Sequence, residues 1–265
     1  MTHLESMPWP RIVFIGGLHR SGTSLLFQAL REHPLVSGFR DTGVPEDEGQ
    51  HLQSVYPPAR AHGGPGHFGF APQAHLTEAS PLVTDYSRET LLREWGVHWD
   101  LTKPVLLEKS PPNLIRTRFL QALFPSSSFL MLLRHPLAVA YATKKWTNAS
   151  LSSLIEHWLL CYSTFDRDRQ HLKSSYIVRY ENLVKDPATL GSVQTFLGLA
   201  AHDVPVHIRP DLDDAYLVKW REARQRQEDS DDAKRIEDRF GERIARFGYS
   251  LEVDRPYIAG AAALT

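Results

Sequence analysis

The chain has 265 residues, of which 42% are hydrophobic and 23% are charged, and its formal net charge is −1. These values are ordinary for a globular protein, and they exclude the strong basic excess of a general nucleic-acid binder. An anion site in this chain must therefore be local, built from a few cations and backbone amides. The single cysteine, Cys161, excludes an intrachain disulfide and a cysteine-based metal cluster.

The length suits one domain over 1–265, with an N-terminal tail at 1–10 and a C-terminal tail at 250–265. The first ten residues lack the apolar run of a secretory signal, and no stretch approaches the ~20 apolar residues of a membrane span. We therefore expect a cytoplasmic protein without a membrane span. A homodimer stays open as an alternative to a monomer.

The predicted elements alternate between strands and helices. The β-branched and aromatic run 11–16 predicts a buried strand, and 21–32 carries apolar residues at helical spacing. Further buried strands are predicted at 104–107, 129–133 and 176–180, and further helices at 86–95, 113–123, 137–146 and 151–172. This order predicts an α/β fold with a mostly parallel sheet covered on both faces, in which ligands bind beyond the carboxyl ends of the strands.

Two segments depart from this alternation. The segment 43–72 is rich in glycine, proline and histidine, and a loop of that length is usually functional or disordered. Its aromatic residues Tyr56, Phe68 and Phe70 favour an ordered wall of an acceptor site. The segment 221–246 is dense in both charge signs, which is typical of a solvated surface helix; a lid over the ligand is the alternative.

A glycine-rich loop, GLHRSGTS at 17–24, follows the first strand and opens the first helix. Its two glycines have the spacing of a nucleotide phosphate loop, where backbone N–H groups converge on an anion at a helix N-terminus. An NTPase loop would continue with a lysine after the second glycine. Here Thr23 follows Gly22, and the cation comes earlier, at Arg20. The residues predicted to bind the ligand are Gly17, His19, Arg20, Ser21, Gly22, Thr23 and Ser24.

The loop resembles the 5′-phosphosulfate loop of sulfotransferases that use 3′-phosphoadenosine 5′-phosphosulfate (PAPS). With His33-Pro34 after the helix, it is similar to the tyrosylprotein sulfotransferase branch and its bacterial relatives. Later segments match in the expected order: LEKSP at 107–111, FPSSSFLMLLRHP at 124–136, VRYENL at 178–183 with DP at 186–187, and RFGY at 246–249. The resemblance implies a P-loop-containing nucleotide hydrolase-like three-layer fold, PAPS as donor and 3′,5′-ADP as product.

The resemblance also implies the nucleotide-binding residues beyond the loop. Arg134, directly after a strand, matches the arginine that binds the donor's 3′-phosphate, and Tyr180 matches the tyrosine near the nucleotide. The family usually places a serine eight residues after that arginine, where this chain has Ala142. Either Thr143 replaces that serine, or one of the lysines at 144–145 neutralises the charge of the 3′-phosphate.

Sulfuryl transfer needs an in-line acceptor, a base, and cations for the charge that grows on the leaving phosphate. We assign that charge to Arg20 and Lys109. For the base, the resemblance places a glutamate shortly after His-Pro, and counting seven residues past Pro34 gives Asp41. The acidic cluster that follows contains Glu48, with His51 three residues on. We favour Glu48, then Asp41, then His51 as the base.

No metal site is expected, because the histidines show no ligand spacing of the HExxH kind. The acceptor is a hydroxyl or an amine of a small molecule, a glycan or a peptide, and no nucleic-acid partner is expected. Two other functions remain as alternatives. One is a P-loop kinase or NTPase, and the other is a non-catalytic nucleotide-binding protein on the same fold.

Overall fold

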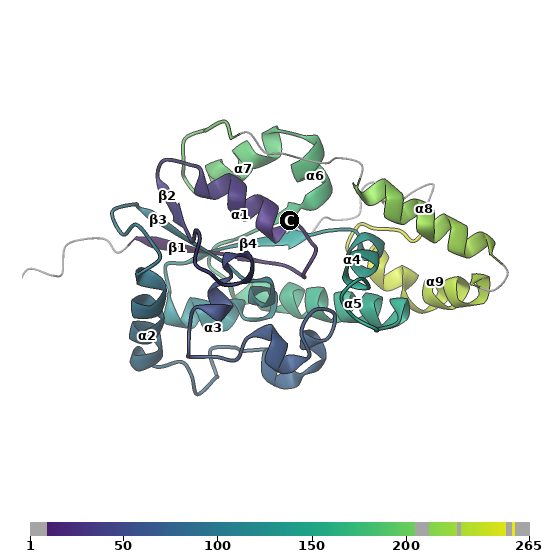
Figure 1. Ribbon diagram of the computed structural model, residues 1–265, viewed down its shortest axis with the longest axis horizontal. Helices are drawn as coiled ribbons and strands as arrows, with labels where there is room; N and C mark the ends of the chain where they lie inside the picture. Colours follow the sequence, from purple (N-terminus) through teal and green to yellow (C-terminus); the bar gives the residue numbers. More distant parts are fainter. Residues whose placement is uncertain (1–9, 205–211, 227–228, 253–255, 258–265) are drawn as a thin grey trace, which may run out of the picture.

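The computed structural model describes residues 10–204, 212–226, 229–252 and 256–257. Its centre is a five-stranded sheet in the order β2-β3-β1-β4-β5, in which all pairs of neighbouring strands are parallel (Figure 1). The strands are β1 Arg11–Gly16, β2 Val36–Gly38, β3 Val105–Lys109, β4 Ser128–Leu133 and β5 Ser175–Arg179. The predicted parallel α/β sheet is therefore confirmed.

Helices cover both faces of the sheet. Figure 1 shows α1, α6 and α7 on one side and α2, α3 and α5 on the other, with α8 and α9 at one end beside α4. The helices are α1 Thr23–Arg31, α2 Asp85–Gly96, α3 Thr117–Leu123, α4 Pro136–Thr143, α5 Leu151–Asp168, α6 Tyr180–Lys185, α7 Ala188–Phe196, α8 Leu212–Gln225 and α9 Ser230–Ala245. No helix in the described ranges is long and apolar enough to cross a bilayer.

The core lies against the middle strands. β1, β3 and β4 are buried along nearly their whole length, because helices cover both faces, and this explains their continuous apolar sequence. Phe14 at the centre of β1 stacks on Phe129 of β4 at 5.7 Å and meets the edge of Trp95 of α2 at 6.1 Å. This packing fixes the strand ends that carry the polar residues described below.

The structure moves several predicted boundaries. The expected helix at 113–123 splits into a 3₁₀ segment, Pro111–Ile115, and α3, with Arg116 between them in a non-helical conformation. α4 ends at Thr143 and α5 at Asp168, each earlier than expected. Tyr180, expected as the last residue of a strand, is the first residue of α6. The short edge strand β2 was not predicted.

The segment 43–72 is ordered, and it carries short 3₁₀ turns instead of long helices. These turns are Pro45–Asp47, Gly49–His51, Ala59–His62 and Phe68–Phe70. Tyr56 and Phe68 are buried in the core, whereas Phe70 is 41% exposed. Most of the charged segment 221–246 falls on the end of α8 and on α9, and residues 227–228 lie outside the described residues.

Candidate functional site

At two positions of the glycine loop, the backbone adopts a conformation that only glycine accommodates. Gly17 and Gly22 have φ of +153° and +99°. A Cβ on Gly17 would lie 2.9 Å from the carbonyl oxygen of Leu132, and one on Gly22 would run into the ring of Tyr180. The loop is therefore pressed between β4 and α6, which explains the spacing of its glycines.

The loop ends in unused hydrogen-bond donors. α1 begins at Thr23 without a side-chain cap and without an acidic residue in its first turn, so its first N–H groups have no partner inside the helix. Among the described residues, the buried Ser21 Oγ and His19 Nδ1 also have no hydrogen-bond partner. Burial lowers the pKa of His19 to about 3, with Lys109 adding to the shift, so this ring is neutral. An anion held at this helix start would accept hydrogen bonds from its first N–H groups, so the loop fits the phosphosulfate end of a nucleotide.

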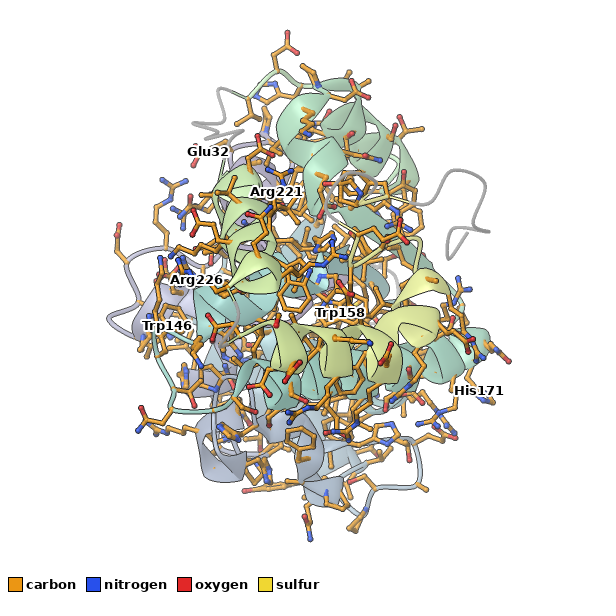
Figure 2. The ribbon with its side chains drawn as sticks, turned by 90° about the vertical axis from the view of Figure 1, so that its right-hand side faces the viewer. Glu32, Trp146, Trp158, His171, Arg221 and Arg226 are labelled. Carbon is orange, nitrogen blue, oxygen red and sulfur yellow. The ribbon has the colours of Figure 1, made fainter. Side chains whose placement is uncertain are left out.

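Arg20 supplies the positive charge of the loop itself. Its backbone lies in the left-handed region at φ +69°, and its exposed guanidinium lies over the ring of Trp146 at 4.8 Å. Trp146 follows α4 and is 58% exposed (Figure 2), so the guanidinium and the indole meet at the surface of the protein.

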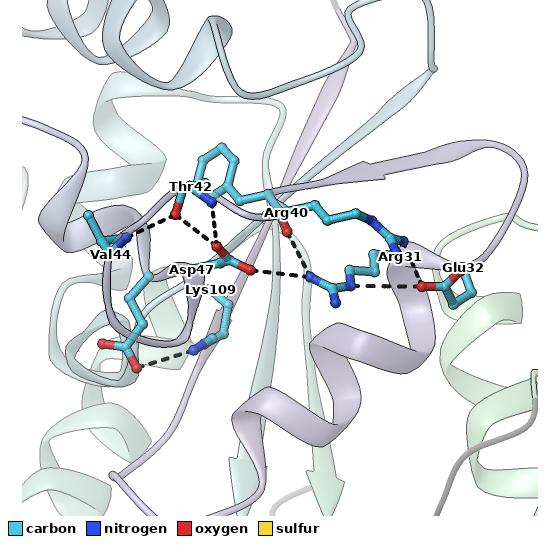
Figure 3. Close-up of polar contacts among 9 residues, drawn as sticks. Arg31, Glu32, Arg40, Thr42, Val44, Asp47 and Lys109 are labelled. Carbon is cyan, nitrogen blue, oxygen red and sulfur yellow. Dashed lines mark hydrogen bonds and ion pairs between the residues drawn. The ribbon is translucent and has the colours of Figure 1, made fainter.

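Lys109 and Glu48 form a buried ion pair beside the loop. Ile15, just before the loop, is the register partner of Lys109, the last residue of β3. Lys109 Nζ lies 3.2 Å from Glu48 Oε1, and both residues are buried. The structure thus brings together two residues that lie far apart in sequence, at the strand edge where ligands bind in such folds (Figure 3).

The other two candidate bases differ in their surroundings. His51 Nε2 is 3.8 Å from Glu48 Oε2, and burial lowers the pKa of this ring against the opposing effect of Glu48. Asp41 is exposed, with φ of +54°, and the described part of the chain gives its carboxylate no hydrogen bond or ion pair. Glu48 and His51 therefore adjoin Lys109 as a group, whereas Asp41 stands apart from it.

Hydrogen bonds hold the segment that carries Glu48 in place. Gln50 Nε2 donates to Glu48 Oε2 at 2.5 Å. Next to it, the Asp47 carboxylate accepts from Thr42 Oγ1 at 2.8 Å and pairs with Arg31 at 3.4 Å (Figure 3). Asp47 and Glu48 thus have separate partners. Glu48 pairs with Lys109 in the candidate site, and Asp47 pairs with Arg31 of α1.

A buried carboxylate that the sequence reasoning missed lies next to this pair. Glu108 accepts from Ser110 Oγ at 2.6 Å and from Asn113 Nδ2 at 2.5 Å. Burial raises the pKa of Glu108 to about 7 despite these bonds. Ser110 Oγ also accepts from the backbone N–H of Gln50, so Glu108 braces the segment that carries Glu48. The signal was present in the motif at 107–111, where a glutamate precedes the lysine.

Arg134 follows β4 and joins the loop to the second half of the predicted nucleotide site. Its Nη1 donates to the carbonyl oxygen of Arg20 at 2.7 Å, and its guanidinium lies over the Tyr180 ring at 3.9 Å. Its Nε donates to Asp213 Oδ1 of α8 at 2.9 Å, and its Nη2 contacts the same oxygen. Tyr180 thus lies close to Arg134, the residue predicted to bind the 3′-phosphate. Asp213 is a neighbour of Arg134 that the sequence did not indicate.

The residues proposed to replace the missing serine lie at the end of α4. Thr143 is buried and lines a small cavity with His19 of the loop. Lys144 is exposed, and Lys145 Nζ lies 3.4 Å from the hydroxyl of Tyr216 in α8. The structure therefore places Thr143 beside the loop and Lys145 against α8. In the described ranges, no group of three or more His, Cys, Asp or Glu side chains could hold a metal ion.

This fold and loop define an α/β protein of the phosphate-loop class, with a ligand site beyond the carboxyl ends of its parallel strands. A model of the sulfotransferase family matches residues 10–203. The chain belongs to the sulfotransferase family, which confirms the resemblance seen in its motifs.

Individual relatives agree with this family. The chain is 25% identical over 210 residues to Protein-tyrosine sulfotransferase 2 of Gallus gallus, covering 74% of this chain and 53% of that protein. It thus spans about half the length of this relative. Its fold resembles that of sulfotransferase STF1 from Mycobacterium tuberculosis H37Rv, with a TM-score of 0.55 and 15% identity over 89% of this chain and 77% of that one. It also resembles STF9 from Mycobacterium avium, with a TM-score of 0.51 and 12% identity over the same shares.

Proposed function

We propose that this chain is a PAPS-dependent sulfotransferase that transfers a sulfuryl group to an acceptor hydroxyl or amine without a metal ion. The observation that carries the proposal is the juxtaposition of an uncapped phosphate loop with the buried Lys109–Glu48 pair at the next strand end. The loop supplies an anion site without the lysine of an NTPase. Membership of the sulfotransferase family supports the same chemistry.

The donor would be held at both of its charged ends. The N–H groups at the start of α1 and the hydroxyls of Ser21, Thr23 and Ser24 would bind the phosphosulfate end. The guanidinium of Arg134 would bind the 3′-phosphate, for which its planar set of donors is suited, with Thr143 as the proposed second residue. PAPS, when bound, supplies a sulfuryl group attached to a phosphate that can leave.

The transfer itself needs a proton acceptor and cations. Glu48 takes the proton from the acceptor's O–H or N–H as the new S–O or S–N bond forms. Lys109 and Arg20 stabilise the negative charge on the phosphate oxygen as its bond to sulfur breaks. One preorganised donor aimed at such charge is worth about 3–4 kcal/mol. Asp41 and His51 are the second and third candidates for the base.

The acceptor, the compartment and the assembly are also proposals. The name of the chicken relative specifies protein tyrosine, so a phenol is a reasonable first probe for the acceptor hydroxyl here. The exposed Phe70 and Trp146 would offer apolar surface to it. A single buried cysteine is consistent with the proposed cytoplasmic location. A homodimer remains an alternative to a monomer.

The test is release of 3′,5′-ADP from PAPS with p-nitrophenol or a tyrosine peptide as acceptor, in the presence of a chelator, with mass spectrometry of the sulfated product. Turnover should survive chelation, and Arg20→Ala should lower it at least ~100-fold. The matched control is Arg40→Ala, which removes a half-exposed arginine paired with Glu32 outside the site and should leave turnover unchanged. Equal turnover by the Arg20 variant and the wild type would refute the role of Arg20. PAPS that stays intact with every acceptor offered would count against the function.

A further inference from the structure

The guanidinium proposed for the 3′-phosphate already holds a carboxylate. Asp213 in the first turn of α8 accepts from Nε of Arg134 at 2.9 Å and is also in contact with Nη2. These two nitrogens form the edge of the guanidinium that arginine uses for bidentate recognition of carboxylates and phosphates. The third nitrogen donates to the carbonyl oxygen of Arg20. Both side chains of the ion pair are at most 10% exposed.

The helix that carries Asp213 is docked over the same half-site. Tyr216 of α8 stacks on Tyr141 of α4, with parallel rings 6.2 Å apart, and packs against Ala138 and Ala142. α4 is the helix that begins directly after Arg134 and His135. α8 lies beside α4 at one end of the sheet (Figure 1), and α9 follows it. The ion pair therefore couples the proposed phosphate-binding arginine to the position of a surface helix.

We propose that Asp213 is a built-in competitor for the donor's 3′-phosphate, and that nucleotide binding releases α8 from Arg134. The proposal rests on the proposed function, because it assumes that Arg134 binds the 3′-phosphate. A dianionic phosphate and a buried carboxylate cannot share one guanidinium edge without strong repulsion. The nucleotide must therefore displace Asp213, and this exchange lowers the affinity for donor and product alike. Because a phosphate competes better than a neutral ribose hydroxyl, the same exchange favours nucleotides that carry a 3′-phosphate.

The opposite role for Asp213 is to orient Arg134 for the phosphate, and the two roles predict opposite results. If Asp213 competes, Asp213→Asn should bind 3′,5′-ADP about 10-fold more tightly than the wild type, within the usual range of such couplings. If Asp213 orients Arg134, the variant should bind more weakly. The matched control is Asp214→Asn, which removes an exposed carboxylate from the next position of the same helix and should leave the affinity unchanged.

The experiment is calorimetric titration of the full chain and both variants with 3′,5′-ADP, together with hydrogen exchange of the wild type. Tighter binding by Asp213→Asn alone, with faster exchange in α8 when 3′,5′-ADP is bound, is the expected result. Equal or weaker binding by Asp213→Asn would overturn the inference while leaving the proposed function intact. The exchange measurement needs no variant, and slower exchange in α8 on binding would also overturn it. If the wild type and Asp213→Asn both fail to bind, the proposed function falls and takes this inference with it.

Discussion

Replacing Lys109 by methionine would remove the charge from a buried ion pair while keeping most of the volume of the side chain. Lys109 Nζ and Glu48 Oε1 are 3.2 Å apart, and the two residues are 0% and 7% exposed. Their attraction over this distance is ~5 kcal/mol at an effective dielectric constant of 20. Much of this is offset by the cost of burying both charges, but Lys109→Met leaves Glu48 buried without its cation. We therefore expect the free energy of unfolding to fall by about 3–5 kcal/mol.

The double variant Glu48→Gln/Lys109→Met separates this effect from a general loss of packing. With neither charge present, we expect its free energy of unfolding to return to within ~2 kcal/mol of the wild type. Urea unfolding followed by tryptophan fluorescence measures the wild type, Lys109→Met, Glu48→Gln and the double variant. Lys185→Met, at an exposed position of α6, is the control and should change stability by less than ~0.5 kcal/mol. If the costs of the two single variants simply add in the double variant, Lys109 and Glu48 do not stabilise each other, which contradicts this prediction.

Three further predictions concern the nucleotide site and the buried carboxylate. Arg134→Ala should raise the Kd for 3′,5′-ADP at least ~10-fold in calorimetry, because a charge-assisted pair is lost, and an unchanged Kd would remove Arg134 from the site. Gly22→Ala should abolish 3′,5′-ADP binding and lower the free energy of unfolding by ~1–3 kcal/mol, because its φ of +99° and the Tyr180 ring leave no room for a Cβ. The control is Gly96→Ala, whose Cβ would lie in open space and should change neither the binding nor the stability. Burial raises the pKa of Glu108 to about 7, so the folded chain binds this proton more tightly than the unfolded chain, and its contribution to stability is lost as pH rises from ~4 to about 7. The wild type should therefore lose stability relative to Glu108→Gln as pH rises across that window in urea titrations, and a difference in unfolding free energy that does not change with pH would contradict the assigned environment.

The strands of the sheet were predictable because a buried parallel strand is a continuous apolar run. β1, β3 and β4 were expected within one or two residues of their observed ends, and the glycine loop follows from its motif. β2, with three residues, is too short for periodicity to detect. The segment 43–72 could not be assigned, since its short 3₁₀ turns produce no apolar period.

The candidate site was likewise predictable only in part. Lys109 and Arg134 could be placed at the sheet edge, because each follows a predicted strand. The contacts of Glu48 with Lys109 and of Asp213 with Arg134 depend on how segments distant in sequence pack against each other. No spacing within the sequence could have predicted these two contacts. Counting residues from His33-Pro34 led to Asp41, which the structure leaves exposed, because a count along the chain does not show which side chains the fold brings to Lys109.

In the proposed function, this chain holds a 3′-phosphorylated adenine nucleotide at an anion site that needs no metal. Calorimetric titration with 3′,5′-ADP in the presence of EDTA tests it most directly, with ATP plus Mg²⁺ as the comparison. We predict a Kd for 3′,5′-ADP on the order of micromolar, unchanged by EDTA, and much weaker binding of ATP. Tight Mg²⁺-dependent binding of ATP with no heat from 3′,5′-ADP would contradict the account.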